Sequence, residues 1–265
     1  MNKIKTIAAN ACRTVLALTF IFSGYVKASD PLGTQYKIHD YLEALGLAAY
    51  APDWLTLCSS IALSAVEFSL GIFMLFAIRR RATSAAMLLF MMAMTAITVW
   101  IAIADPVSDC GCFGDAVILT NMQTLAKNIV LLACAATVYA WPLRMYRFIS
   151  RPAQWIAINY TILYSIATST YCLYALPVFD FRPYHIGADI RKGMEIPPGA
   201  EQPQFETTFI LKKNGQTKEF TLENYPDSTW TFVDSKTVQT SEGYVPPIHD
   251  FSMEDMTTGD DMTDD

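Results

Sequence analysis

The sequence predicts an all-α membrane protein: a four-helix transmembrane bundle plus a fifth span, with a small β-rich extracytoplasmic C-terminal module. Three features predict this fold class. Long apolar segments recur through the first two thirds of the chain, basic residues gather in alternate connections, and the charge changes sign. Residues 1–176 carry 12 Lys and Arg against 8 Asp and Glu, whereas residues 177–265 carry 7 against 17. The first part is therefore a membrane body and the second an acidic appendage.

Five apolar segments are long enough to cross a bilayer, whose hydrocarbon core takes roughly 20 residues of helix. Their apolar residues lie all round the predicted helix instead of along one stripe, as contact with lipid requires. The segments cover about residues 7–26, 55–78, 83–104, 124–143 and 155–176. We expect the first four to form the bundle and the fifth to be an additional span.

The connections between the spans predict the orientation. If the spans alternate, eight basic residues share one side of the membrane, and the positive-inside rule places that side in the cytoplasm. These residues are Lys3, Lys5, Arg79, Arg80, Arg81, Arg144, Arg147 and Arg151. We therefore predict a multi-pass protein of a bacterial inner (plasma) membrane, with a cytoplasmic N-terminus and an extracytoplasmic C-terminal module.

The first span has an alternative interpretation as a signal peptide. Lys3 and Lys5 precede an apolar centre, and Val26-Lys27-Ala28 resembles a cleavage site. Cleavage would leave four spans and the same sidedness for everything that follows.

The connection between the third and fourth spans contains Cys110-Gly111-Cys112-Phe113-Gly114 and is predicted to face outward. That compartment is oxidising in bacteria, so disulfide chemistry can operate there. Glycine permits the positive φ that a turn this tight requires, at Gly111 and again at Gly114. The pair could be a redox site, a static disulfide or half of a soft-metal site. No two histidines have ligand spacing, so we expect no metal.

The other cysteines fall into two groups. Cys58 and Cys172 map near the outer face and are candidates for a resolving or relay role, whereas Cys12 and Cys134 are expected to be small apolar fillers. Charges near the Cys110–Cys112 loop have opposite effects on the pKa of its thiols. The following helix N-terminus and Lys127 lower a thiol pKa, whereas Asp109 and Asp115 raise it.

Glu67 lies near the middle of the second span, with no countercharge one helical turn away. A carboxylate at that depth must be protonated, paired or turned towards a polar cavity, and it is a functional candidate by default. Arg13 is a candidate partner, and a hydroxyl such as Ser64 or Thr98 is another. The functional use of Glu67 would be proton uptake or contact with a quinone headgroup, so a quinone is the candidate cofactor.

The chain divides into four predicted regions. Residues 1–150 form the bundle, residues 151–176 the fifth span, and residues 177–249 a linker with a β-hairpin module. Two strand-like runs flank Asn214-Gly215, a strong hairpin signal, and a third strand follows near residues 229–234. Residues 250–265 form an acidic, disordered tail. So abrupt an end is also compatible with a fragment of a longer protein.

Two sequence blocks resemble known families. Residues 20–27 with Asp30-Pro31 look like the start of DoxX-like membrane proteins. Cys110-Gly-Cys-Phe-Gly114, with Asn121 and Lys127-Asn128, resembles MauE, the methylamine utilisation membrane proteins. The resemblance implies a four-helix bundle that handles disulfides or reducing equivalents outside the cytoplasm, often beside a thioredoxin-like partner. It also supports Cys110 and Cys112 as the site and Lys27 as a family position.

These observations lead to two functional hypotheses. In the first, the protein carries reducing equivalents or exchanges disulfides through Cys110 and Cys112, as a component of a thiol–disulfide oxidoreductase system. Its partners would be the lipid bilayer and a thioredoxin-like periplasmic protein, with no nucleic acid. In the second, it is a non-enzymatic anchor or assembly factor whose cysteine pair is a structural disulfide.

Overall fold

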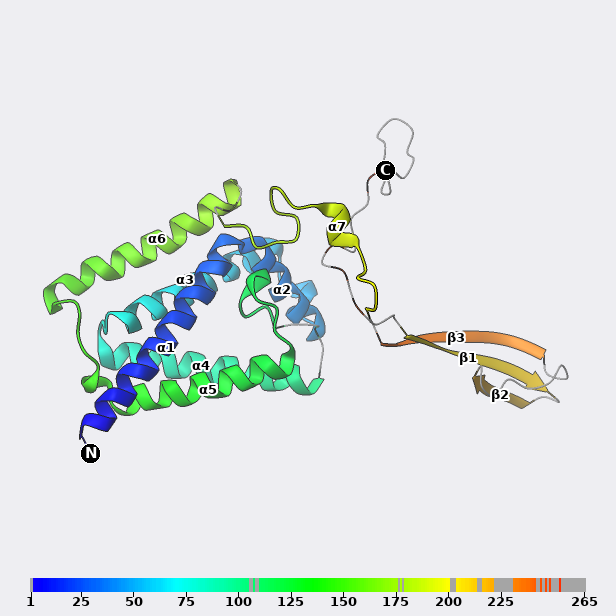
Figure 1. Cartoon of the computed structure of the whole chain (residues 1–265), viewed down its shortest axis with the longest axis horizontal. Helices are drawn as coiled ribbons and strands as arrows, with labels where there is room; N and C mark the ends of the chain where they lie inside the picture. Colours follow the sequence, from blue (N-terminus) through cyan, green and yellow to red (C-terminus); the bar gives the residue numbers. More distant parts are fainter. Residues whose placement is uncertain are drawn as a thin grey trace. The chain divides into compact units, whose positions relative to one another are not determined.

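The computed structural model divides into two compact units, residues 1–182 and 183–265. The first holds helices α1 to α6 (Figure 1), and the second holds the short helix α7 and strands β1 to β3. The structure describes residues 2–104, 107, 110–175, 177, 179–200, 204–213, 216–221, 231–241, 244, 246, 248 and 253.

Four helices of the first unit are long and apolar enough to cross a membrane. They are α1 (Asn2–Ser29), α3 (Asp53–Leu75), α4 (Arg80–Ala104) and α5 (Asn121–Ala140). Helix α2 (Pro31–Ala44) runs between the first two of these, and 3-10 turns lie at Ala48–Tyr50, Gly114–Ala116, Pro142–Arg144 and Arg151–Ala153. The protein is therefore a multi-pass membrane protein with mostly helical architecture.

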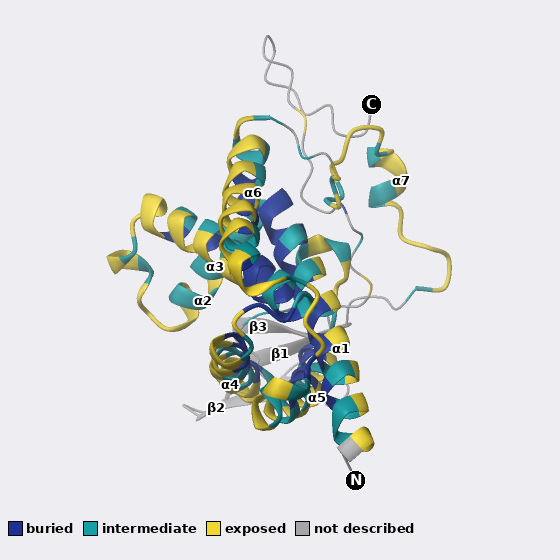
Figure 2. Cartoon of the chain, turned by 90° about the vertical axis from the view of Figure 1, so that its left-hand side faces the viewer, coloured by how far each residue is buried: buried dark blue, intermediate teal, exposed yellow. Residues whose placement is uncertain are grey.

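The fifth predicted span forms a helix but differs from the other four. Helix α6 (Gln154–Tyr174) is not among the helices apolar enough to be candidate spans. Its buried face, which packs against α1 and α3, carries small polar residues one turn apart, at Thr161, Ser165 and Ser169. Small and hydroxyl side chains suit close packing between membrane helices, yet they lower the mean hydropathy of the segment. Exposed residues cover the outer face of α6 (Figure 2).

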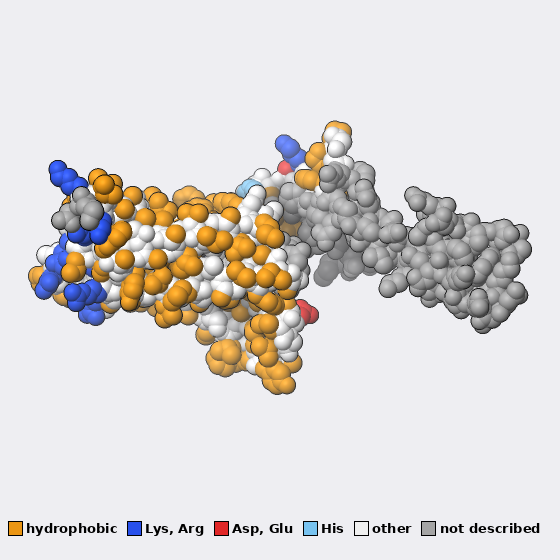
Figure 3. Space-filling view, turned by 90° about the horizontal axis from the view of Figure 1, so that it is seen from below, with side chains coloured by type: hydrophobic (Ala, Val, Ile, Leu, Met, Phe, Trp, Pro, Cys, Tyr) orange, Lys and Arg blue, Asp and Glu red, His pale blue; other side chains and the backbone are white. Residues whose placement is uncertain are grey.

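The two ends of the bundle hold the loops that alternating spans require. At one end, Arg80 at the start of α4 donates to the carbonyl oxygens of Leu143 and Met145, and Asn10 donates to that of Arg144. Figure 3 shows Lys and Arg side chains gathered at one end of the apolar helical body. The Cys110–Cys112 loop contacts the other end of α1. The second and fourth connections thus share one end of the bundle and the third lies at the other, as alternating spans require.

Helix starts near the outer loops follow local capping chemistry. The Asp30 carboxylate accepts a hydrogen bond from the Gly33 amide at 3.0 Å, and Pro31 occupies the first helical position of α2. Thr120 and Gln123 form a capping box at the start of α5. Both caps place a helix start beside the cysteine loop.

Helices α1 and α3 approach each other closely at two glycines. A Cβ added at Gly24 of α1 would lie 2.4 Å from the Phe68 backbone nitrogen, and one added at Gly71 of α3 would lie 2.6 Å from that of Ile21. Close approach of backbones through small residues is a standard means of packing membrane helices. Helices α1 and α3 form the closest-packed pair of the bundle. Their packing determines which residues of α1 lie at the same height along the bundle as which residues of α3.

The second unit contains a three-stranded antiparallel sheet of order β2-β1-β3. The strands are β1 (Gln204–Lys213), β2 (Gln216–Thr221) and β3 (Thr231–Ser241), and β1 pairs with both others. Helix α7 (Ile190–Met194) precedes them. The predicted turn at Asn214-Gly215 lies outside the described residues, as does the predicted acidic tail apart from Met253.

We predict that Gly24→Ala and Gly71→Ala each lower the free energy of unfolding by about 1–3 kcal/mol, because the added methyl group forces the two backbones apart. Denaturant unfolding in detergent measures the change. Ala62→Val adds two carbon atoms, more than either glycine variant, at an exposed position of α3 and serves as the control. Glycine variants as stable as this control would contradict the close-packing interpretation.

Candidate functional site

The Cys110–Cys112 loop is a tight turn built on two glycines. Gly111 has φ +60° and Gly114 has φ +52°, a backbone region that residues with a Cβ rarely adopt. The Gly114 amide donates to the Gly111 carbonyl oxygen at 3.1 Å, which closes the turn. This turn brings the Sγ atoms of Cys110 and Cys112 to 3.0 Å, with both thiols free.

The two thiols differ in acidity. The hydrogen bond from Cys110 lowers the pKa of Cys112 to about 6, against the effect of burial, and the charges of Lys127 and Lys27 lower it further. The same hydrogen bond and burial raise the pKa of Cys110. At neutral pH the loop therefore holds one thiolate, on Cys112, and one thiol, on Cys110. A thiolate beside its own proton donor is the arrangement that thiol–disulfide exchange requires.

Hydrogen bonds from two helices hold the loop in place. Tyr41 of α2 donates its hydroxyl to the Cys110 carbonyl oxygen at 2.6 Å. The Ser23 hydroxyl of α1 lies 2.7 Å from the Cys112 carbonyl oxygen and 2.7 Å from Glu67 Oε2. Ser23 thus connects the backbone of the cysteine loop to Glu67.

Glu67 pairs with Lys27, not with Arg13. Lys27 Nζ lies 2.6 Å from Glu67 Oε1, and both residues are buried, with 6 % and 4 % of their surface exposed. Arg13 lies towards the other end of α1, where its guanidinium donates to the Tyr146 carbonyl oxygen and stacks on Phe148. A buried ion pair between two spans stabilises only when each charge has its partner, so the pairing locks Lys27 beside Glu67.

A second lysine approaches the loop from α5. Lys127 Nζ lies 4.1 Å from the centre of the Phe113 ring, a cation–π contact, and Phe113 packs on Phe22 of α1. The contact keeps a positive charge near Cys112, although Glu67 acts on the pKa of Cys112 in the opposite direction. Lys127 was expected from the sequence to lower a thiol pKa, and it is one of the charges that do so.

The remaining residues singled out in the sequence lie apart from the sulfur pair. Cys58 is exposed on α3, and Cys172 is half-buried on α6. Neither lines the cavities beside Cys112. Asp109 lies outside the described residues, whereas Asp115 lines a pocket at the C-terminal end of α1. Within the described ranges, no three His, Cys, Asp or Glu side chains are grouped closely enough to hold a metal ion.

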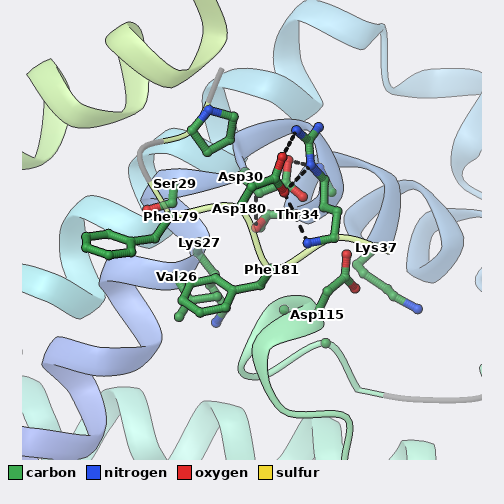
Figure 4. A pocket seen from close by; sticks show the side chains of 15 residues that line it. Val26, Lys27, Ser29, Asp30, Thr34, Lys37, Asp115, Phe179, Asp180 and Phe181 are labelled. Atoms are coloured by element: carbon green, nitrogen blue, oxygen red, sulfur yellow. Dashed lines mark hydrogen bonds and ion pairs between the residues drawn. The ribbon is translucent and has the colours of Figure 1, made fainter. Parts of the chain in front are cut away.

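That pocket is covered by the chain segment that follows α6 (Figure 4). Phe179 packs on Tyr25 of α1, with 6.4 Å between ring centres, and Phe181 lines the same pocket. Arg182 forms a two-pronged ion pair with Asp180, at 2.8 and 2.6 Å. The segment therefore closes over the helix ends beside Gly111 and Gly114.

The sequence analysis missed the pairing partner of Glu67 and the role of Ser23. Lys27 was noted only as a family position, because it follows the first span while Glu67 lies mid-way along the second. The signal that could have identified the pair is that Lys27, with Lys37 and Lys127, is one of three cations near the membrane on the side of the cysteine loop.

Two family models match the chain. The model described as methylamine utilisation protein MauE covers residues 5–141. The chain belongs to the MauE family. The match includes all four candidate spans and the Cys110–Cys112 loop. A second model, a domain of unknown function named DUF8463, covers residues 205–242 and so coincides with the sheet. No curated protein and no solved structure matches the chain.

We predict that Cys112 reacts with iodoacetamide as a thiolate down to about pH 6 and that its reactivity falls below that pH. Cys110→Ala removes the hydrogen bond and should move the midpoint towards the ordinary thiol range near 8.5. Peptide-resolved mass spectrometry measures alkylation against pH in the purified protein. Cys110→Ser keeps a hydroxyl donor and is the matched control, expected to retain a low midpoint. Identical midpoints in the alanine and serine variants would show that the charges alone set the acidity.

We predict that Lys27→Met and Glu67→Leu each destabilise the protein by about 3–5 kcal/mol, because each leaves one buried charge without its partner. The double variant removes both charges and should lose clearly less than the sum of the two. A double-mutant cycle from denaturant unfolding in detergent measures the coupling. Lys3→Met, at an exposed position, is the control for loss of a lysine. Additive losses would mean that the ion pair contributes nothing.

Proposed function

We propose that this MauE-family protein exchanges disulfides, or carries reducing equivalents, on the periplasmic side of the bacterial inner membrane. The observation that supports it is the loop in which a half-buried thiolate, Cys112, lies 3.0 Å from a second thiol, Cys110. Two sulfur atoms so placed form a disulfide by a small movement and release it again by reduction. The protein would then be the membrane component of a thiol–disulfide oxidoreductase system.

Bonds and electrons balance in this exchange with the loop and its partner alone. The Cys112 thiolate attacks the disulfide of a thioredoxin-like periplasmic partner, and a mixed disulfide forms while one partner sulfur leaves as a thiolate. Cys110 then loses its proton and attacks Cys112, which releases the second partner sulfur. The partner ends as a dithiol and the loop as a disulfide. The reverse sequence reduces the loop.

The sidedness is part of the proposal. With the eight basic residues in the cytoplasm, the Cys110–Cys112 loop faces the periplasm. If α6 crosses as a fifth span, the β-rich C-terminal module is extracytoplasmic too. The module would then lie in the same compartment as the partner. The DoxX-like resemblance of residues 20–31 agrees with this topology but adds no separate support for the chemistry.

The alternative function is a membrane anchor or assembly factor whose cysteine pair is a fixed staple. The specific observation that favours it is the separate β unit matched by its own family model, which could bind a partner. The two functions differ in whether the sulfur atoms change redox state while the protein works.

We predict that Cys110→Ser traps a mixed disulfide with a periplasmic protein through Cys112, whereas Cys112→Ser traps far less, because the raised pKa of Cys110 leaves little thiolate. Acid quenching followed by non-reducing electrophoresis and mass spectrometry measures the adducts. Cys58→Ser leaves the pair intact and is the control.

Two outcomes would count against exchange. A loop that stays in one redox state in membranes treated with dithiothreitol or diamide would assign it to a staple. So would loss of protein abundance in the double serine variant, if Cys110→Ser also traps no adduct. Labelling by an impermeant maleimide in inverted vesicles, but not in whole cells after reduction, would overturn the periplasmic orientation.

A further inference from the structure

A cavity beside the cysteine pair is lined by the loop and by four helices. It has a volume of about 210 Å³ and ends at Cys110, Gly111 and Cys112. Its walls come from α1, α2, α3 and α4, and they are mostly apolar. The residues that complete it are Lys27, Thr34, Lys37, Ile38, Tyr41, Leu63, Met94, Ile97 and Thr98.

The cavity is placed to receive a ligand from the bilayer. Ile97 is 44 % exposed on α4, a candidate span, so this wall lies at a surface that lipid covers. Helix α4 packs mainly against α5, whereas α3 packs mainly against α1. Leu63 of α3 and Ile97 of α4 therefore border a gap between the two helix pairs, at the level of the sulfur atoms.

The volume of the cavity and its polar groups restrict the kind of ligand that it can bind. An apolar cavity of about 150 Å³ is known to hold a benzene molecule, so 210 Å³ accommodates one substituted six-membered ring. Lys27 lines the cavity, and its ammonium group is paired with Glu67 through one of its three donors. A ring that carries carbonyl oxygens could accept a hydrogen bond from another of these donors, which an acyl chain cannot do.

We propose that this cavity binds the headgroup of a lipid-soluble quinone, which oxidises the Cys110–Cys112 dithiol. This inference rests on the proposed thiol–disulfide function and supplies its electron acceptor. The Cys110 thiol loses its proton, the two sulfur atoms lose one electron each, and the Cys110–Cys112 sulfur–sulfur bond forms; the second proton that the quinone takes up comes from water. The quinone gains two electrons and two protons and leaves as a quinol. Lys27 stabilises the negative charge that develops on the quinone oxygen, and Glu67 positions Lys27.

The position of the cavity explains why one pair can serve two reactants. Cys112 lines this cavity and also the smaller one that contains Glu67 and Asn128. A protein dithiol, which reduces the loop disulfide, must approach from the aqueous side of the loop, whereas a quinone, which oxidises the loop dithiol, arrives through the bilayer. Reduction and oxidation of the same two sulfur atoms can then take place from opposite sides.

The test uses the full-length protein in lipid nanodiscs, reduced, desalted and mixed anaerobically with decylubiquinone. We expect one quinol for each Cys110–Cys112 disulfide, followed by the loss of quinone absorbance and by mass spectrometry. Leu63→Trp and Ile97→Trp fill the cavity and should slow quinone reduction at least tenfold. Both should keep the wild-type rate of oxidation by diamide, which is water-soluble. Ile97 is exposed, so its variant keeps the test decisive if Leu63→Trp does not fold.

Leu89→Trp places the same side chain at a 66 % exposed position of α4 and is the control, expected to reduce quinone at the wild-type rate. Diamide oxidation of the pair without any quinol formation would overturn the quinone site and leave the exchange function standing. Full quinone reduction in both cavity variants would assign the cavity to a lipid chain and overturn the proposal. A pair that no oxidant changes would instead refute the exchange function itself.

Discussion

The buried ion pair between Lys27 and Glu67 is the constraint on which the rest of this structure depends. Two charges withdrawn from water inside a membrane bundle are tolerated only if each compensates the other. Their contact therefore joins α1 to α3 at one level, and the glycines at positions 24 and 71 allow the helices to come close enough for it. The cysteine loop rests on this junction through Ser23.

The chemistry of the sulfur pair follows from that support. A short turn between two spans would leave its thiols equivalent, with ordinary acidity. Here Lys27 and Lys127 place positive charge on the side of Cys112, and the hydrogen bond between the sulfur atoms makes the two thiols unequal. Tyr41 and Ser23 hydrogen-bond to the carbonyl groups of Cys110 and Cys112. The loop is therefore held in place, and the difference in acidity between the two thiols does not depend on a flexible loop. The membrane body thus acts as the scaffold that positions one small turn with two thiols.

Much of the architecture could be predicted from composition and spacing. The four candidate spans, the alternation of their ends and the family of residues 5–141 follow from apolar length, from the arginine clusters and from the Cys-Gly-Cys-Phe-Gly block. Local rules also account for helix starts, such as the cap at Asp30. The fifth predicted span is the exception to this agreement. The hydroxyl residues that let α6 pack closely on the bundle also lower its hydropathy, so length and hydropathy do not make it a candidate span.

The sequence by itself determined that two thiols share a turn between apolar helices and that Glu67 is a buried charge in need of a partner. Only the tertiary structure decided that the partner is Lys27. Gly24 lies against Phe68, so α3 begins well beyond the end of α1, and its first ten or so residues, roughly 15 Å of helix, run beside α2. Glu67 is mid-way along its own helix yet level with the last turns of α1. Depth in a bundle depends on how helices are staggered, and stagger is set by packing between residues far apart in the chain.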